Sequence, residues 1–170
     1  RNVAEDIANV ELRPRFVSLV DDDDQGGAVL KKLRNHKVDT SFIRQVPDGM
    51  GMWLAVFDNT GDLAGSISKR PDLSYMAQLL EEDGDRIFAD ADSIVIEIDL
   101  DKEIIKQVFK FAKKYNKKVY AVVANMGIAS QRRDFLQSTD CFVCNVLEAG
   151  ILFVSDFSKL SPEELCLELR

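Results

Sequence analysis

The stretch SIVIEIDLDKEIIKQVFKFAKKYNKKVYAVV, residues 93–123, decides the fold of this chain. Its ends, SIVIEI and KVYAVV, are short apolar runs rich in β-branched residues, which predict strands over 93–98 and 118–123. The segment between them carries apolar residues at helical spacing and predicts a helix over 102–115. A strand, a helix and a second strand in this order form a βαβ unit, whose strands lie parallel.

The same alternation continues on both sides of this unit. Apolar spacing predicts helices over 2–10, 28–33, 73–88, 128–137 and 145–154, with another beginning at the SPEE motif of 161–164. Apolar runs predict strands over 15–20, 38–46 and 141–144. We expect Asn2 to cap the first helix and Gly84 to divide the helix over 73–88. This order predicts a doubly wound α/β fold, a mostly parallel sheet with helices on both faces, in a single domain spanning 1–170.

One segment departs from the alternation. The run MWLAVF at 52–57 and the return run at 63–68 predict two antiparallel strands joined by a turn over 58–62. Gly61 supplies the positive φ that such turns require. A hairpin inside an α/β order is a candidate lid or dimer flap. Its Trp53 is open to two interpretations, packing within the lid or stacking on a substrate, and we favour packing.

Composition limits the classes of function. The chain has 170 residues, of which 46% are hydrophobic and 30% charged, and a net charge of −7. Nucleic acids and anionic membranes bind basic surfaces, so neither is an expected partner, whereas a small anionic substrate is compatible with a locally positive site. No apolar segment reaches the roughly 20 residues of a membrane span. Three cysteines without a disulfide pattern favour a reducing cytoplasm, and Cys141 and Cys144 are expected to pack in a buried strand.

Polar residues follow the predicted strands, at the sheet edge where ligands of such folds bind. They are VDDDDQGG at 20–27, Asp99 and Asp101, Asn125, and NVLE at 145–148. The four aspartates suggest either a metal cluster or the start of a helix capped by Asp23 or Asp24, and we favour the helix start because neighbouring side chains at a turn point apart. His36 belongs to a polar turn that ends a helix and is expected at the surface.

An ordered set of motifs then resembles a known family. RNVA (1–4), VDDDDQG (20–26), VDTS (38–41), the hairpin and the N-x-x-E motif of 145–148 are similar, in this order, to the ribokinase-like carbohydrate kinases, also called the PfkB family. The resemblance implies an ATP-dependent kinase that transfers the γ-phosphoryl group to a hydroxyl of a sugar or nucleoside. The RNVAE opening and LAVFDNTGDL of the hairpin look most like the pseudouridine kinase branch.

The resemblance also implies roles for particular residues. Asn2 stands where the family's asparagine contacts the sugar, and the hairpin 52–68 matches the lid that covers the sugar and often forms a homodimer contact. Asn145 and Glu148 match the motif whose glutamate helps hold Mg²⁺ near the ATP phosphates, and Asn125 is placed beside the phosphate cleft. Asp21 occupies a position where the family has glycine, which puts the close approach made there in doubt.

One part of the family's signature has no counterpart here. The glycine-rich G-x-G-D loop, whose aspartate is the general base, does not occur between Arg1 and Arg170, so no residue of this chain is assigned as catalytic. We therefore expect a central fragment of a kinase, inactive by itself, with the base beyond Arg170. The alternative is a non-catalytic ribokinase-like module for ligand binding or dimerisation. A dinucleotide-binding fold is disfavoured because no G-x-G-x-x-G follows a strand.

Overall fold

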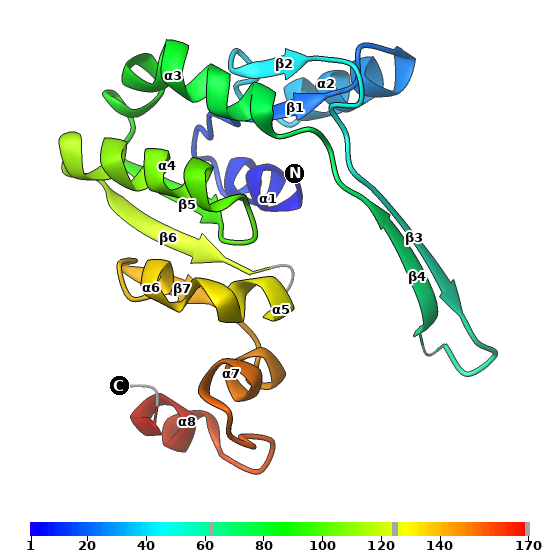
Figure 1. Cartoon of the computed structure of the whole chain (residues 1–170), viewed down its shortest axis with the longest axis vertical. Helices are drawn as coiled ribbons and strands as arrows, with labels where there is room; N and C mark the ends of the chain where they lie inside the picture. Colours follow the sequence, from blue (N-terminus) through cyan, green and yellow to red (C-terminus); the bar gives the residue numbers. More distant parts are fainter. Residues whose placement is uncertain (62, 124–125, 169–170) are drawn as a thin grey trace. The chain divides into compact units, whose positions relative to one another are not determined.

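The structure is a computed structural model of the chain and describes residues 1–61, 63–123 and 126–168 (Figure 1). The chain divides into two compact units, Arg1–Ile87 and Phe88–Arg170. Strands and helices alternate along most of the sequence, as the hydrophobic pattern predicts. Among the described residues, no helix combines the length and the apolar character needed to cross a membrane.

The first unit contains a short parallel sheet, an antiparallel hairpin and helices. Its elements are α1 (Asn2–Asn9), β1 (Ser18–Val20), α2 (Asp24–Asn35), β2 (Ile43–Gln45), β3 (Met52–Phe57), β4 (Leu63–Lys69) and α3 (Ser74–Phe88). β1 and β2 pair in parallel, with Ser18 opposite Ile43 and Val20 opposite Gln45. The strand predicted from residue 15 is shorter than expected, although an isolated parallel bridge joins Arg15 to Asp39.

The core of the first unit lies where α1 and α2 meet the sheet. Ala4 from α1 and Leu33 from α2 are buried together with Val38, which leads into β2. Phe16 and Ile43 pack against this cluster from the sheet side. Burial of these side chains removes apolar surface from water and is the main stabilising term available to so short a sheet.

The hairpin formed by β3, β4 and their turn runs away from the β1–β2 sheet as a long two-stranded arm (Figure 1). Cross-strand neighbours include Leu54 opposite Ile67 and Trp53 opposite Ser68. Gly61 has a φ of 89°, which confirms its predicted role in the turn. The Asp58 carboxylate accepts hydrogen bonds from the backbone N–H of Thr60 at 2.8 Å and from its hydroxyl at 2.6 Å. The turn is therefore shaped by its own side chains.

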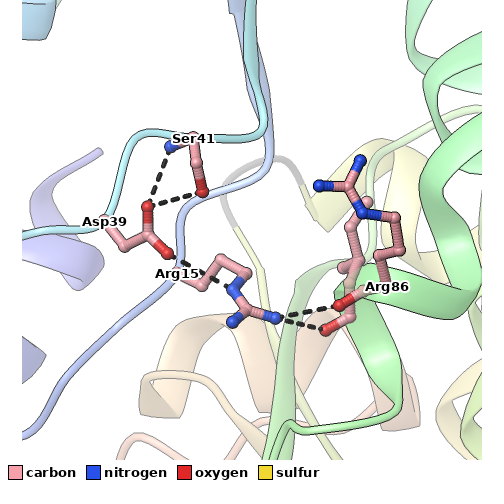
Figure 2. Close-up of polar contacts among 5 residues, drawn as sticks. Arg15, Asp39, Ser41 and Arg86 are labelled. Carbon is pink, nitrogen blue, oxygen red and sulfur yellow. Dashed lines mark hydrogen bonds and ion pairs between the residues drawn. The ribbon is translucent and has the colours of Figure 1, made fainter.

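An arginine-centred network joins the start of the sheet to the end of α3 (Figure 2). Arg15 donates from Nε to the Asp39 carboxylate at 3.3 Å, and from one terminal nitrogen to the carbonyls of Arg86 and Ile87, both at 3.1 Å. Asp39 also accepts from the backbone N–H of Ser41 at 2.9 Å and from its hydroxyl at 2.6 Å. One guanidinium thus satisfies carbonyls of the last turn of α3 and holds an ordered carboxylate.

The second unit is built on a three-stranded parallel sheet in the order β5-β6-β7. Its elements are β5 (Ser93–Glu97), α4 (Lys102–Lys114), β6 (Lys118–Val122), α5 (Met126–Ala129), the 3₁₀ turn η1 (Ser130–Arg132), α6 (Arg133–Leu136), β7 (Cys141–Val143), α7 (Val146–Phe153) and α8 (Pro162–Glu168). The βαβ unit predicted from 93–123 is confirmed, because β5 and β6 are parallel neighbours joined by α4.

Helix α4 covers the sheet with one apolar face. Ile105 is fully buried, and Ile104 and Val108 are nearly so. Burial alternates along β5: Ile94 and Ile96 are buried, and the side chains between and beside them are exposed. Alternation of this kind places one face of β5 against packed side chains.

Three local expectations were wrong. Gly84 does not divide α3; it is itself buried, and burial of the apolar face around it outweighs the roughly 1 kcal/mol cost of a helical glycine. The helix expected over 128–137 is broken into α5, η1 and α6, at a point where the Ser130 hydroxyl donates to the carbonyl of Gly127 at 3.2 Å. Asn2 is the first residue of α1 rather than its cap, because Arg1 holds the cap position.

The Asp39 network predicts an acid-sensitive contribution to stability. Partial burial opposes ionisation, but the hydrogen bonds from Ser41 and Arg15 outweigh it and lower the pKa of Asp39 from its ordinary value of 3.8. A pKa that is lower in the folded state adds stability above about pH 4, and this stability is lost as the pH falls through the folded pKa. The difference in free energy of unfolding between wild type and Asp39→Asn is therefore expected to be largest near pH 7 and to shrink below pH 3.8.

Urea denaturation at pH 7, 5 and 3 measures this difference. An Arg15→Met background, which leaves the Ser41 bonds in place, is expected to reduce the effect of Asp39→Asn. An Asp39→Asn effect of the same size at pH 7 and pH 3 would contradict the assignment of the stability to the ionised carboxylate.

Candidate functional site

The acidic run after β1 starts a helix. Asp23 is the cap of α2, and its carboxylate accepts hydrogen bonds from the N–H groups of Gln25 and Gly26, both at 2.9 Å. Asp24 begins the helix, and Asp22 is exposed. Across residues 1–61, 63–123 and 126–168, no group of three or more histidine, cysteine, aspartate or glutamate side chains is arranged to hold a metal ion. The helix-start interpretation is confirmed, with Asp23 as the cap.

Asp21 points to a different partner from the rest of the run. Its Oδ1 accepts a hydrogen bond from the backbone N–H of Met50 at 2.9 Å, where the chain enters the hairpin. A Cβ added at Gly26 would overlap the carbonyl oxygen of Asp21, so the first turn of α2 lies directly on this residue. One signal of this contact is visible in the sequence, because Asp21 stands where the resemblance leads one to expect glycine.

Asn2 lies at the beginning of α1 and is exposed. Its side-chain oxygen accepts a hydrogen bond from the guanidinium of Arg1 at 2.9 Å. This placement leaves the amide of Asn2 at the surface of the first unit, where a ligand is able to reach it.

Asn145 and Glu148 form a capping box at the start of α7, directly after β7. The Asn145 side-chain oxygen accepts from the N–H of Glu148 at 2.8 Å, and Oε2 of Glu148 accepts from the N–H of Asn145 at 2.8 Å. Asn145 is exposed, and Glu148 is half-buried. The N-x-x-E motif therefore has a local structural role, because each side chain satisfies a backbone donor that the helix start leaves open.

The cysteines near this cap are less enclosed than the sequence predicts. Cys141 is exposed and Cys144 half-buried, so the expectation of a buried strand was wrong for Cys141. In the described part of the chain β7 is the last strand of its sheet, and Val143 is also 61% exposed. Burial, and after it the Glu148 carboxylate, raises the pKa of the Cys144 thiol. A raised pKa opposes thiolate chemistry at the C-x-x-C pair.

The carboxyl end of β5 carries the other candidates in the second unit. Asp99 is buried, and Asp101 holds the cap position of α4. Because β5, β6 and β7 are parallel, the residues after β5 and β7 share one edge of the sheet. Asn125, which follows β6, lies outside the described residues. Sequence analysis missed Arg132, whose guanidinium donates to the carbonyl of Leu100 at 3.5 Å.

A shallow hollow of about 470 Å³ lies along α7 and the loop that follows it. Its lining is mostly apolar and includes Leu147, Ile151 and Phe157. Neither Asn145 nor Glu148 lines it. The hollow begins beside the capping residues, because Val146 and Leu147 line it, but the polar candidates themselves do not.

The half-buried carboxylate of Glu148 fits the kind of magnesium site that the resemblance implies. Mg²⁺ keeps several waters and binds proteins through one or two carboxylates together with phosphate oxygens, so a dedicated cage of side chains is not required. In the capping box Oε2 of Glu148 accepts a hydrogen bond from the N–H of Asn145, and this bond fixes the orientation of the carboxylate. Such an orienting contact is typical of groups that bind ions.

Solved structures of kinases share this fold. The chain matches the structure of Arabidopsis thaliana ribokinase complexed with ribose and ATP with a TM-score of 0.76 and 19% sequence identity, over 99% of this chain and 54% of that one. It matches 2-dehydro-3-deoxygluconokinase from Thermotoga maritima with a TM-score of 0.75 and 19% identity, over 99% of this chain and 57% of that one. The predicted ribokinase-like α/β fold is confirmed, with parallel sheets flanked by helices and an antiparallel hairpin.

Sequence comparison identifies the family. The model of the pfkB family carbohydrate kinases matches residues 1–168, and the chain belongs to this family. The chain is also 32% identical to a guanosine-inosine kinase from Exiguobacterium acetylicum, over 165 residues that make up 96% of this chain and 54% of that protein. The chain thus spans about half the length of the relatives it matches.

The capping box predicts how Glu148 responds to substitution. Glu148→Ala removes the acceptor for the Asn145 N–H and is expected to weaken the start of α7 by about 1 kcal/mol, whereas glutamine also fills this position of a capping box. Amide hydrogen exchange at Asn145 is therefore expected to rise about fivefold in Glu148→Ala and much less in Glu148→Gln. Exchange in Glu148→Gln as fast as in Glu148→Ala would contradict the capping role.

Proposed function

We propose that this chain is part of an ATP- and Mg²⁺-dependent kinase that transfers the γ-phosphoryl group of ATP to a hydroxyl of a nucleoside. The observation that carries the proposal is the pfkB family match over 1–168, in a chain that retains the N-x-x-E motif at a strand end. The relative from Exiguobacterium acetylicum, a guanosine-inosine kinase, favours a purine nucleoside over a free sugar. The pseudouridine kinase branch remains a second hypothesis within the nucleoside class.

The hairpin is consistent with a nucleoside as phosphoryl acceptor. Trp53 and Phe57 are 61% and 58% exposed on β3, so their rings are open to contact. An aromatic ring stacks on a nucleobase with a gain of about 1 to 3 kcal/mol. A free sugar offers no comparable planar face. In this proposal the hairpin acts as a lid over the substrate.

Each remaining candidate has a role in the proposal. Asn2 hydrogen-bonds hydroxyls of the ribose with its exposed amide. Asn145 orients Glu148 through the capping box, and Glu148 holds Mg²⁺ through its water shell beside the ATP phosphates. The bound ion supplies positive charge that stabilises the transferring phosphoryl group. Asn125 is proposed to contact the phosphates as well.

The general base is proposed to lie outside this chain, beyond Arg170. Phosphoryl transfer requires a group that receives the proton of the attacking hydroxyl, and the sequence contains no G-x-G-D loop to provide it. On this proposal residues 1–170 form an incomplete part of one kinase domain, and they have no turnover on their own.

The hairpin is also the proposed homodimer contact. Leu54 and Ile67 lie directly opposite each other, and Met52 and Val56 share their face because side chains alternate along a strand. All four of these side chains are more than half exposed. A contiguous apolar face on an isolated two-stranded sheet is unstable in water unless another surface covers it. A second copy of the hairpin offers an apolar face of the same shape.

A cytoplasmic enzyme acting on small molecules fits the remaining features. Cys141, Cys144 and Cys166 are free thiols, which suits a reducing compartment. The net charge of −7 disfavours nucleic acid and anionic membranes as partners.

Turnover by the full-length protein tests the proposed function. With MgATP, we expect phosphorylation of guanosine or inosine with a higher kcat/KM than of pseudouridine or ribose. Glu148→Gln keeps the cap but loses the charge, and its activity is expected to fall by about 10- to 100-fold. Glu164→Gln is the matched control, because Glu164 occupies the same position of a second capping box, with Ser161 at the start of α8.

Separate outcomes address each part of the proposal. If guanosine, inosine, pseudouridine and ribose all remain unphosphorylated, the kinase proposal fails and a non-catalytic binding module takes its place. Full activity of Glu148→Gln would rule out a role for the Glu148 carboxylate in Mg²⁺ binding and leave it only its role as a helix cap. Turnover by residues 1–170 alone would overturn the assignment of the general base to a segment outside this chain.

The dimer proposal predicts that one lysine on the hairpin separates the subunits. Leu54→Lys places a charge opposite Ile67 in the proposed contact and is expected to weaken dimerisation at least about 30-fold, the effect of an interface hot spot. Leu12→Lys is the control, because Leu12 is similarly exposed, at 61% against 55% for Leu54, and lies outside the hairpin. Sedimentation equilibrium measures both, and equal effects of the two substitutions would rule out a contact through the hairpin.

A further inference from the structure

The connection between β2 and β3 packs closely against the end of β1. The N–H of Val46 donates to the carbonyl of Val20 at 2.9 Å, and a Cβ added at Gly49 would overlap the same carbonyl oxygen. Gly49 is buried, and its N–H donates to the carbonyl of Val46 at 3.2 Å. A tight turn thus lies on the last peptide of β1, so the segment before the hairpin has a fixed backbone path.

The Asp21 carboxylate provides the next contact along this path. Its Oδ1 accepts from the N–H of Met50 at 2.9 Å, one residue after the turn and two residues before β3. The backbone of Asp21 is itself held, because Gly26 in the first turn of α2 lies against its carbonyl. The side chain therefore reaches from a fixed point to the residue at which the hairpin leaves the unit.

A second contact joins the two sides of the hairpin root. Met52, the first residue of β3, lies opposite Lys69, the last residue of β4. The ammonium group of Lys69 pairs with the Asp48 carboxylate in the turn, and this contact raises the pKa of Lys69, with a smaller contribution from Asp21. Gly51 also approaches the Lys69 carbonyl so closely that a Cβ there would lie 3.2 Å from its oxygen.

We propose that Asp21 is a positioning residue, whose carboxylate anchors the root of the hairpin to the end of β1 and sets the direction in which the hairpin leaves the first unit. Beyond this root, both faces of the hairpin carry exposed apolar side chains, so within the first unit its direction depends on contacts at the root. The functional consequence rests on the proposed kinase activity: the anchor sets how well the lid meets the phosphoryl acceptor.

Hydrogen–deuterium exchange of the full-length protein tests the anchor without reference to activity. Asp21→Ala removes the acceptor, and exchange at Met50 and Gly51 is expected to rise at least about tenfold while α2 and β1 keep their protection. Asp21→Asn retains an oxygen acceptor and is expected to restore most of the protection at Met50. Asp22→Ala, an exposed neighbour in the same acidic run, is the matched control and is expected to leave the root unchanged.

Two exchange results would overturn the anchor. Unchanged protection of Met50 in Asp21→Ala would show that the hydrogen bond does not hold the root. An equal loss of protection across β1, α2 and the root would make Asp21 a general stabiliser of the first unit rather than a positioning residue.

Steady-state kinetics then separate the anchor from the proposed function. In Asp21→Ala we expect kcat/KM for the phosphoryl acceptor to fall about 10- to 100-fold, mainly through KM, with a much smaller change in KM for ATP. If Asp21→Ala loses protection at Met50 but the wild type phosphorylates none of the compounds, the proposed kinase activity is refuted and the anchoring role of Asp21 is retained. An active wild type with unchanged acceptor KM in Asp21→Ala would refute the role of the anchor in substrate binding.

Discussion

Parallel pairing of strands that are separated by helices is the constraint on which both units depend. β1 pairs in parallel with β2, and β6 pairs in parallel with both β5 and β7. A chain that leaves one parallel strand has to cross over before it enters the next, and helices provide most of these crossovers. Each strand end is consequently a place where a helix often begins, and the polar residues that cap those helices, such as Asp23 and Asn145, stand at the edge where ligands of such folds bind.

This constraint explains why structural and proposed functional roles fall on the same side chains. Glu148 satisfies a backbone donor of Asn145, and the same bond fixes the carboxylate in one orientation. A group held in this way before a ligand arrives loses less conformational entropy on binding. A helix cap and an ion-binding carboxylate are therefore compatible, and substitution by glutamine rather than alanine distinguishes the two contributions.

Local patterns in the sequence were sufficient for most of the fold. The separate strands and helix of the βαβ unit, the positive φ of Gly61 and the cap at Asp23 all follow from residues within a few positions of one another. The parallel pairing of β5 with β6 then follows from the general geometry of strand–helix–strand connections. Contacts between distant residues gave no such pattern: Asp21 meets Met50 across 29 positions, and Arg15 meets the end of α3 across more than 70. Composition also shows which residues are apolar but not which are covered, and so the exposure of Cys141 was missed.

The exposed hairpin has a consequence for the accuracy of its own folding. In most strands a slip of one residue moves apolar side chains into water, and this cost selects the correct register. On β3 the apolar side chains occupy consecutive positions from Met52 to Leu54, so a slipped pairing would bury or expose nearly the same surface. Hydrophobicity alone therefore does not define which residues face each other. That information has to come from the turn, where the Asp58 carboxylate and the left-handed backbone of Gly61 fix where the chain reverses.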